Sequence, residues 1–408
     1  MSKNQLSTEI NGETQKFTPS LEMKSMPSRF MVSATLTKKV DPHLLQKAVD
    51  TITPRFSFIQ VKEKRWLLSS SLIFDGHTPQ VTPLSRQDRT VLYPKSTEPL
   101  SIIYTEDSIG ITASHTLTDG HGVLDILKSL ILTYHRLAGM KIPESNLILE
   151  PGSSSKQQET EDTFKTYYRQ EIPSSKISGN AFHTTGRAIE NHTIRYITGT
   201  IRIEDLKAKT ETYKITITEY LAAVYLYALY RIQRKSSAKR TPIRLSIPVD
   251  LRKLYDSKTL RNFSLFIRPE IHTGLGSYDF SEIVHHVYHS MRFDLQKKNI
   301  SSAIRSSLIN HLYTWKLLHQ RGEKNRGERL HSGTLSNLGK ISLPEELSKS
   351  VSHFDFLLGP NRINPENCGL VGYDKEIHVN FTRTVEDPVV SREFFRLLVE
   401  QGIPVEIH

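Results

Sequence analysis

The feature that most limits the possible folds of this chain is a change in the spacing of its apolar residues at position 115. Residues 101–114 (SIIYTEDSIGITAS) have the pattern of two strands separated by a polar turn. Soon after His115, residues 122–139 (GVLDILKSLILTYHRLAG) place apolar side chains at helical spacing and stop at Gly139. The sequence therefore predicts a buried strand that leads into a helix, with His115 at the junction.

Strand-like and helix-like patterns alternate along the rest of the chain. The strand-like segments are residues 30–36 (FMVSATL), 58–71 (FIQVKEKRWLLSSS), 196–203 (YITGTIRI), 243–249 (IRLSIPV) and 369–385 (GLVGYDKEIHVNFTRTV). The helix-like segments are residues 42–56 (PHLLQKAVDTITPRF), 218–233 (TEYLAAVYLYALYRIQ) and 392–401 (REFFRLLVEQ). This alternation predicts an α/β protein with layered sheets and helices.

The length of 408 residues exceeds the size at which one hydrophobic core usually stops growing, so we expect two domains. A polar stretch from 151 to 193 has only weak patterning, around TFKTYYR, and is the candidate connection. The predicted organisation is a flexible tail over 1–22, an N-terminal domain over 23–160 that carries His115, a connection over 161–195 and a C-terminal domain over 196–408.

The formal charge of +11 indicates an anionic partner but does not choose among a nucleic acid, a membrane surface, a phosphorylated cofactor and an acidic carrier protein. Basic residues cluster in RKSSAKR (234–240) and RGEKNRGER (321–329). Neither run is interleaved with the aromatic residues of a single-strand binding groove, so we interpret both as solvated loops and expect no nucleic-acid partner.

Targeting signals are not evident in the sequence. The first twenty residues have no apolar core of the kind a secretory signal needs, and no later apolar run approaches the ~18 residues that span a bilayer. The single cysteine, Cys368, cannot form an internal disulfide and has no neighbours at metal-ligand spacing. We expect a soluble cytoplasmic protein without a transmembrane segment.

The segment HTLTDG is the strongest candidate for chemistry. Acyl transfer to a hydroxyl or amine needs a base with a pKa near neutrality, and the His115 imidazole is suited to that task. Asp119 can brace the loop against a cation, and Gly120 permits a sharp turn or a close substrate approach. The alternative is that Asp119 and Gly120 only cap the start of the helix.

HTLTDGHG resembles the HxxxDG signature of the superfamily that includes chloramphenicol acetyltransferase, plant acyl-CoA acyltransferases and peptide-synthetase condensation domains. Further similar motifs follow in order: SIPVDLR (246–252), Asn262 in RNFSLF, SNLG (336–339) and DFLLG (355–359). The similarity is greatest to bacterial alcohol-acetyltransferase-like proteins. Ser114 occupies the place of the first histidine of the condensation-domain pair.

The resemblance implies a fold of two chloramphenicol-acetyltransferase-like domains that form a pseudo-dimer around a central channel, with the catalytic histidine at its middle. It also implies a structural salt bridge between Asp119 and Arg252, with Asn262 holding the loop. Ser336 and Asn337 are the candidate oxyanion donors, whereas Asp355 and Gly359 shape the fold. On the residues alone, the alternative for Arg252 is a surface arginine after a strand, and the alternative for SNLG is an edge strand with an ordinary turn.

The predicted function is acyl transfer from a thioester to a small alcohol or amine, with His115 as general base. The donor is an acyl-CoA or an acyl carrier protein, so coenzyme A thioester is the expected cosubstrate, with no bound cofactor, no metal and a monomeric enzyme. Two alternatives stay open: a stand-alone condensation-type domain that joins carrier-bound substrates, and a non-catalytic relative of the fold that binds a ligand.

A second group of histidines lies in IVHHVYHS. His285 and His289 have the i, i+4 spacing of metal ligands on a helix, with His286 beside them, but no Glu, Asp or Cys follows at a useful interval. We therefore expect these three side chains to lie on a partly exposed helix face.

Overall fold

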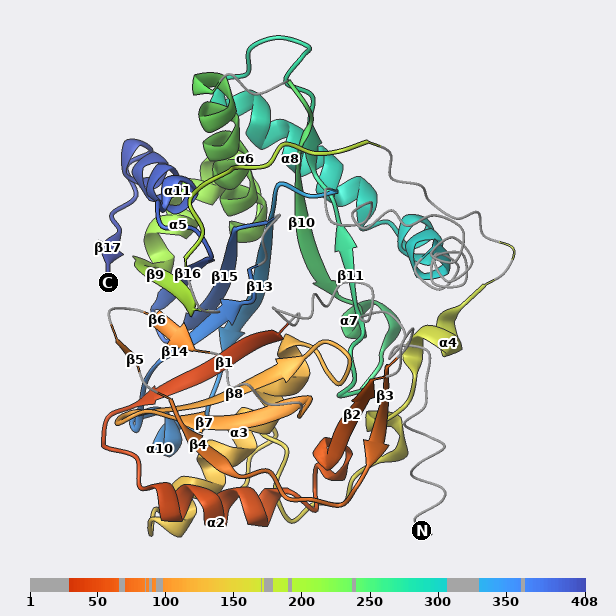
Figure 1. The fold of residues 1–408 in the computed structure, drawn as a ribbon, viewed down its shortest axis with the longest axis vertical. Coiled ribbons are helices and arrows are strands. Elements are labelled where there is room, and N and C mark those ends of the chain that lie inside the picture. The colour runs from red at the N-terminus through yellow and green to blue at the C-terminus, as the bar shows by residue number, and fades with distance from the viewer. Residues whose placement is uncertain are drawn as a thin grey trace. The chain divides into compact units, whose positions relative to one another are not determined.

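The computed structural model describes residues 29–65, 70–84, 86–87, 90–92, 98–169, 171, 179–189, 193–236, 240–306, 330–360 and 364–408. These residues form two compact α/β units (Figure 1). Unit 1 comprises the described residues up to Thr166 together with Asp250–Ser264 and Lys340–Phe356, and unit 2 comprises the remainder. Each unit is therefore built from discontinuous segments, although the domain limits predicted from the sequence were continuous.

Unit 1 contains a five-stranded sheet in the order β14-β1-β8-β7-β4. Helix α3 packs against β1 and β8, and α2 packs against α3 and β4 (Figure 1). The elements of this unit are β1 (Arg29–Leu36), α2 (Pro42–Ile52), η2 (Ser57–Ile59), β2 (Val61–Arg65), β3 (Ser70–Phe74), β4 (Val81–Pro83), β5 (Arg86–Gln87), β6 (Thr90–Leu92), β7 (Leu100–Tyr104), β8 (Ser108–Ser114), α3 (Gly120–Leu137), η3 (Gln157–Glu159), α4 (Thr163–Tyr167), α7 (Arg252–Tyr255), α10 (Glu345–Ser348) and β14 (Val351–Leu358), the last up to Phe356.

The strands at the centre of unit 1 are buried along their whole length. All eight residues of β1 and all seven of β8 are buried, and the two strands pair antiparallel with Phe30 opposite Ala113. The burial includes polar positions of both strands, among them Ser33, Thr112 and Ser114. The β8 strand is thereby a rigid support for the loop that follows it.

Helix α3 begins and ends within two residues of the limits that its sequence pattern indicates. Asp119 is its N-cap and accepts a hydrogen bond from the backbone N–H of Gly122. After the last turn, Gly139 has φ of 90°, a conformation that glycine adopts without steric cost. The predicted helix from 122 to 139 is thus confirmed, with its first turn starting slightly earlier, at Gly120.

Unit 2 contains a sheet that runs β11-β10-β13-β15-β16-β9, with β12 paired to β10 and β17 to β9. Its elements are β9 (Thr193–Arg202), α5 (Ile203–Tyr213), α6 (Ile217–Lys235), β10 (Ile243–Asp250), β11 (Ser264–Ile267), β12 (Glu270–Ile271), α8 (Phe280–Asp294), β13 (Gly333–Ile341), β15 (Glu366–Tyr373), β16 (Glu376–Arg383), α11 (Val389–Glu400) and β17 (Glu406–Ile407). Helix α6 packs against α5, α8 and α11 (Figure 1).

Most of the predicted elements are confirmed, and the α/β fold class with them. The segment 58–71, predicted as one strand, includes β2 and the first two residues of β3, and these two strands pair antiparallel with each other. The predicted tail (1–22) and the basic run at 321–329 lie outside the described residues. Within the described ranges, no helix is both long enough and apolar enough to cross a membrane.

Candidate functional site

The loop from His115 to Asp119 connects the buried strand β8 to helix α3. Its turn is closed by the carbonyl of Ser114, which accepts hydrogen bonds from the backbone N–H groups of Leu117 and Thr118 at 3.0 and 3.4 Å. The Thr118 hydroxyl donates to the carbonyl of Leu260 at 2.6 Å. The loop is therefore tied to both its own strand and the 259–262 segment of unit 1.

Asp119 forms a bidentate ion pair with Arg252, and both residues belong to unit 1. Arg252 Nη1 lies 2.9 Å from Asp119 Oδ2, and Nη2 lies 3.0 Å from Oδ1. The side chains are only 13% and 5% exposed, so this arginine is not a surface residue. Asp119 also caps α3, so the two roles considered for it from the sequence coexist in one side chain.

The guanidinium of Arg252 uses every one of its donors. Nε donates to the carbonyl of Thr259 at 2.7 Å, Nη1 also donates to Asp250 Oδ1 at 2.8 Å, and Nη2 also donates to the carbonyl of Arg261 at 2.8 Å. With the two bonds to Asp119, five N–H groups meet five oxygens. Arg252 thus holds the 259–261 backbone and the HTLTDG loop in one fixed arrangement.

Two further hydrogen bonds complete this network. The backbone N–H of Phe263 donates to Asp119 Oδ2 at 2.9 Å. Asn262 Nδ2 donates to the carbonyl of His115 at 3.1 Å, while Asn262 Oδ1 accepts from the Ser264 hydroxyl at 2.9 Å. Asn262 therefore forms its hydrogen bond with the backbone of the histidine and not with the imidazole.

The glycines of the motif have distinct surroundings. Gly120 is the first residue of α3 and is not among the described residues with positive φ. Gly122 is the position of close approach, because a methyl group there would overlap the Thr118 hydroxyl and the carbonyl oxygen of Leu260. Gly122 stands within HTLTDGHG, but no role for it was predicted from the sequence.

The charges of the network stabilise each other. Burial raises the pKa of Asp119, but the opposing guanidinium of Arg252 and the hydrogen bonds to the carboxylate outweigh it, so the net pKa lies below the usual value. Burial lowers the pKa of Arg252, and the carboxylates of Asp119 and Asp250 more than reverse this effect. Asp119 therefore stays ionised and is a poor proton carrier at neutral pH.

The His115 ring lies against the ring of Phe30, with centroids 4.5 Å apart and an angle of 34° between the planes. The residue is partly exposed. Desolvation lowers the pKa of His115 to about 4, although the negative charge of Asp119 opposes the shift. The imidazole is therefore neutral at physiological pH and has a free lone pair that can accept a proton.

The two predicted oxyanion donors lie on β13 of unit 2. Ser336 is buried, and its hydroxyl has no hydrogen-bond partner among the residues described in the structure. Asn337 Nδ2 donates to the Thr218 hydroxyl at 2.9 Å, and Asn337 Oδ1 accepts from the backbone N–H of Gly339 at 2.7 Å. Gly339 has φ of 78°, so Asn337 stabilises a local turn of the strand.

Among the described residues, neither the cysteine nor the histidines of α8 form a second reactive centre. Cys368 lies in β15, and burial raises the pKa of its thiol well above the usual value, so it is not a nucleophile in the folded protein. His285, His286 and His289 are exposed on α8, as the sequence indicated.

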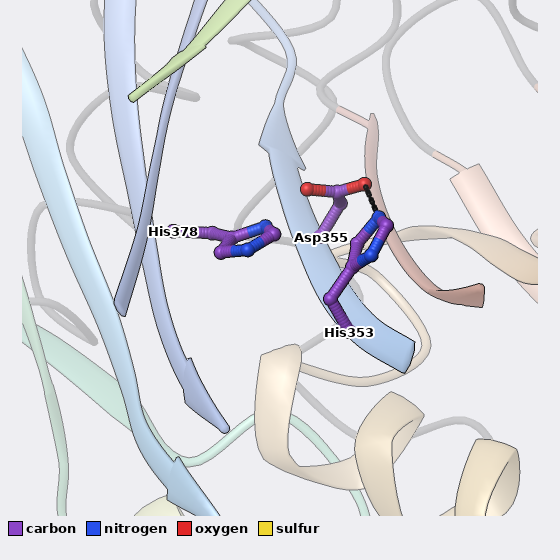
Figure 2. Close-up of side chains that lie close together, drawn as sticks. All are labelled: His353, Asp355 and His378. Atoms are coloured by element: carbon purple, nitrogen blue, oxygen red, sulfur yellow. Dashed lines mark ion pairs between the residues drawn. The ribbon is translucent and has the colours of Figure 1, made fainter. Parts of the chain in front are cut away.

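Figure 2 shows His353 and Asp355 of β14, where His353 Nε2 lies 3.6 Å from Asp355 Oδ2. His378, drawn with them, belongs to β16 of unit 2. In the described parts of the chain, no group of three His, Cys, Asp or Glu side chains at metal-ligand spacing lies within a single unit. The pair on β14 offers fewer ligands than a typical metal site requires.

Asp250 and Phe30 also contact the site, although neither was predicted from the sequence. Asp250 was visible in SIPVDLR, where a carboxylate two residues before Arg252 was the available signal. Phe30 had no comparable signal, because its contact with His115 depends on how β1 pairs with β8.

Comparison by sequence finds no matching family model and no matching curated protein. Comparison by structure finds many similar folds at low identity. Polyketide synthase associated protein 5 from Mycobacterium tuberculosis is 14% identical, with a TM-score of 0.59 and 96% of each chain covered. TRI101 from F. sporotrichioides, in complex with coenzyme A and T-2, is 10% identical, with a TM-score of 0.59 and coverage of 95% of this chain and 97% of that one.

The starter condensation domain of rhizomide synthetase, in complex with C8-CoA and Leu-SNAC, is 11% identical, with a TM-score of 0.59 and coverage of 97% of this chain and 95% of that one. These similarities extend over nearly the whole chain, so they concern its complete fold. The chain therefore has the fold of the condensation domains and the chloramphenicol-acetyltransferase-like acyltransferases.

Proposed function

We propose that this protein is an acyltransferase that moves an acyl group from a thioester to an alcohol or amine, with His115 as general base. The observation that carries the proposal is the state of His115: a neutral, partly exposed imidazole on a loop fixed by the Asp119–Arg252 ion pair. The fold, which is shared with proteins solved in complex with coenzyme A or an acyl-CoA, adds independent support.

In the proposed reaction, His115 accepts the proton of the acceptor hydroxyl or amine as its oxygen or nitrogen attacks the thioester carbonyl. The carbonyl oxygen becomes an oxyanion in the tetrahedral intermediate. When the intermediate collapses, the carbon–sulfur bond breaks and the imidazolium returns the proton to the leaving thiolate. The enzyme ends in its starting state, and neither a covalent enzyme intermediate nor an external oxidant or reductant takes part.

Asp119 and Arg252 act as positioning residues in this scheme. Arg252 donates hydrogen bonds to both carboxylate oxygens of Asp119. Asp119 in turn accepts a hydrogen bond from the backbone N–H of Gly122 and so fixes the first turn of α3. A carboxylate held in this way stabilises the loop geometry but has no reason to exchange protons with the imidazole. Asn262 contributes by fixing the carbonyl of His115.

We propose Ser336 as the principal oxyanion donor, because its hydroxyl has no competing partner among the described residues, whereas the Asn337 amide already holds a turn. One properly aimed donor lowers a barrier of this kind by roughly 3 kcal/mol. A Ser336→Ala variant should therefore lose about a hundredfold in kcat with little change in KM.

The donor in this proposal is a coenzyme A thioester or an acyl carrier protein, and the acceptor is a small alcohol or amine. The net charge of +11 suits either donor, since coenzyme A carries phosphates and carrier proteins are usually acidic. We further propose that the enzyme works in the cytoplasm as a monomer.

The test is a screen of acyl thioesters against alcohols and amines, read out by release of the free thiol. His115→Ala should lower kcat by about a hundredfold to ten-thousandfold. His43→Ala is the matched control, because His43 is exposed on α2 and takes no part in the site. Full activity of the His115→Ala variant on a verified substrate pair would refute the mechanism.

The same screen separates the alternatives. Turnover of free acyl-CoA supports the acyltransferase, whereas turnover that requires a carrier-bound donor and a carrier-bound acceptor identifies a condensation-type domain. Saturable binding of a thioester without transfer by either route would identify a non-catalytic relative.

A further inference from the structure

The pairing of β1 with β8 brings an aromatic side chain to His115. Phe30 lies opposite Ala113 in this antiparallel pair, and His115 follows Ala113 by two residues. His115 is the first residue after β8, which ends at Ser114. The register therefore places Phe30 near the end of β8, beside the start of the loop that carries the histidine.

The contact that results is close, and a second ring supports it. The centroids of Phe30 and His115 are 4.5 Å apart. The ring of Phe356, on the neighbouring strand β14, meets Phe30 edge-on at a centroid distance of 6.2 Å and an angle of 82°. Phe30 itself is only 1% exposed. Its ring thus contacts both Phe356 and His115, and all three residues belong to unit 1.

The His115 imidazole lacks the usual means of orientation. In hydrolases with a serine, histidine and aspartate, a carboxylate bonds one ring nitrogen and so fixes the ring and its tautomer. Here neither ring nitrogen of His115 has a hydrogen-bond partner among the described residues, and Asn262 binds only the carbonyl. The ring of Phe30 is the aromatic contact observed for the imidazole, and it restricts rotation of the side chain.

The charged groups near the histidine do not replace this contact. Asp119 acts on His115 only through space, since its oxygens bond Arg252, Gly122 and Phe263. Arg29, beside Phe30 on β1, lies opposite Ser114 and directs its guanidinium to Glu98, Ser101 and Thr112. Alternation along the strand turns Arg29 away from the face that carries Phe30.

We infer that Phe30 is a positioning residue for His115, whose ring holds the imidazole in a single orientation and shields one of its faces from water. This inference rests on the proposed function, since it assigns a role in presenting the base to the acceptor. The restraint on the imidazole ring itself does not depend on turnover. Phe30 touches neither proton nor substrate in this role.

The experiment compares Phe30→Leu and Phe30→Ala with Phe58→Leu. Phe58 is a buried phenylalanine of the same unit, in η2, and makes no ring contact with His115 among the described residues. The His115 ring is titrated by proton NMR, with a His115→Gln variant to assign its signal. The pH dependence of kcat/KM is measured on the substrate pair from the thiol-release screen.

We expect kcat to fall about tenfold in Phe30→Leu with a smaller change in KM, because the base no longer occupies one orientation. The pKa of His115 should rise from about 4 by about one unit, since water reaches the uncovered face. Phe58→Leu should leave both quantities unchanged. Should Phe30→Ala fail to fold, Phe30→Leu decides the result.

An unchanged His115 titration and an unchanged kcat in the folded Phe30→Leu variant would overturn the inference. A shifted titration in a protein that transfers no acyl group would instead refute the proposed function and leave the positioning role of Phe30 standing. The two failures are therefore distinguishable.

Discussion

At the scale of single residues, Arg252 determines the geometry of the site. Its five N–H groups meet the carboxylates of Asp119 and Asp250 and two backbone carbonyls. A buried charge of this kind is costly unless all its donors are satisfied, and a planar guanidinium can satisfy them at once. Lysine has the same charge but neither the planar shape nor the number of donors.

Arg252→Lys should therefore lower the free energy of unfolding by about 3 kcal/mol, because several carbonyl and carboxylate oxygens lose a charged donor. Transferase activity should fall as well, since the loop that carries His115 is released. Urea unfolding followed by circular dichroism measures the first effect. Arg187→Lys, at a side chain that is 80% exposed, is the control and should leave the midpoint unchanged. Equal midpoints for the two variants would contradict a structural role for Arg252.

The low pKa of His115 predicts an unusual pH profile. Protonation blocks a general base, and the imidazole stays neutral down to about pH 4 because its folded pKa is about 4. The acid limb of kcat/KM should therefore lie near pH 4, well below the unperturbed histidine value of about 6.5. An acid limb near 6.5 in the native enzyme would show that the ring is better hydrated than the structure indicates.

The same shift affects stability. The pKa of His115 is lower in the folded protein than in the unfolded chain. The neutral ring therefore makes its full contribution to the free energy of unfolding above about pH 6.5, and this contribution is lost as the pH falls through about 4. Between these values the unfolded chain takes up a proton that the folded protein does not. His115→Gln should remove this part of the pH dependence from denaturation curves.

At the scale of elements, the junction between α3 and the 259–262 segment fixes the loop. Gly122 lies in the first turn of α3, where the backbone passes so close to Leu260 and Thr118 that no side chain fits. The Thr118 hydroxyl bonds the carbonyl of Leu260 at the same contact. The glycine is required there by space, because its φ is not positive.

Gly122→Ala should lower the free energy of unfolding by about 1–3 kcal/mol, the usual cost of overpacking, and should reduce activity by displacing the loop. Thermal unfolding and the thiol-release assay measure the two effects. Gly152→Ala is the matched control, since a methyl group there meets no atom within 4 Å, and it should change stability by less than about 0.5 kcal/mol. If Gly122→Ala behaves like the control, the close approach is more easily relieved than the packing implies.

At the scale of the whole molecule, unit 1 depends on segments from distant parts of the chain. Residues 250–264 supply Arg252 and Asn262, and residues 340–356 supply most of β14. Without them, β1 loses a neighbouring strand and Asp119 loses its buried cation. An isolated N-terminal segment therefore contains the catalytic motif but not the contacts that shape it.

A fragment of residues 1–166 should not fold cooperatively by itself, because it leaves Asp119 as an unpaired buried charge and exposes the edge of β1. Folding of the fragment is measured by the dispersion of its NMR signals and by the sharpness of its thermal transition. Co-expression with residues 167–408 is the control and should restore the folded protein. A fragment that unfolds cooperatively without its partner would show that the first segment is self-sufficient.

Local patterns allowed much of this protein to be predicted from its sequence. The change of spacing at residue 115 placed His115 between a buried strand and a helix, because strand and helix periodicities differ within a few residues. The helix limits followed from Asp119 and Gly139, which act on their own neighbours. Arg252 and Asn262 were candidates because their motifs resemble those of a known superfamily.

Only the tertiary structure decided which residues touch. The register of β1 and β8 brings Phe30 to His115. The packing of α3 against residues 259–262 requires glycine at position 122. Residues 250–264 and 340–356 belong to unit 1 although they are distant in sequence from the rest of it. These contacts join positions far apart in the chain, where no periodicity links one residue to the other. The sequence by itself determined the elements and the candidate base, and long-range packing determined the surroundings that give the base its orientation and its low pKa.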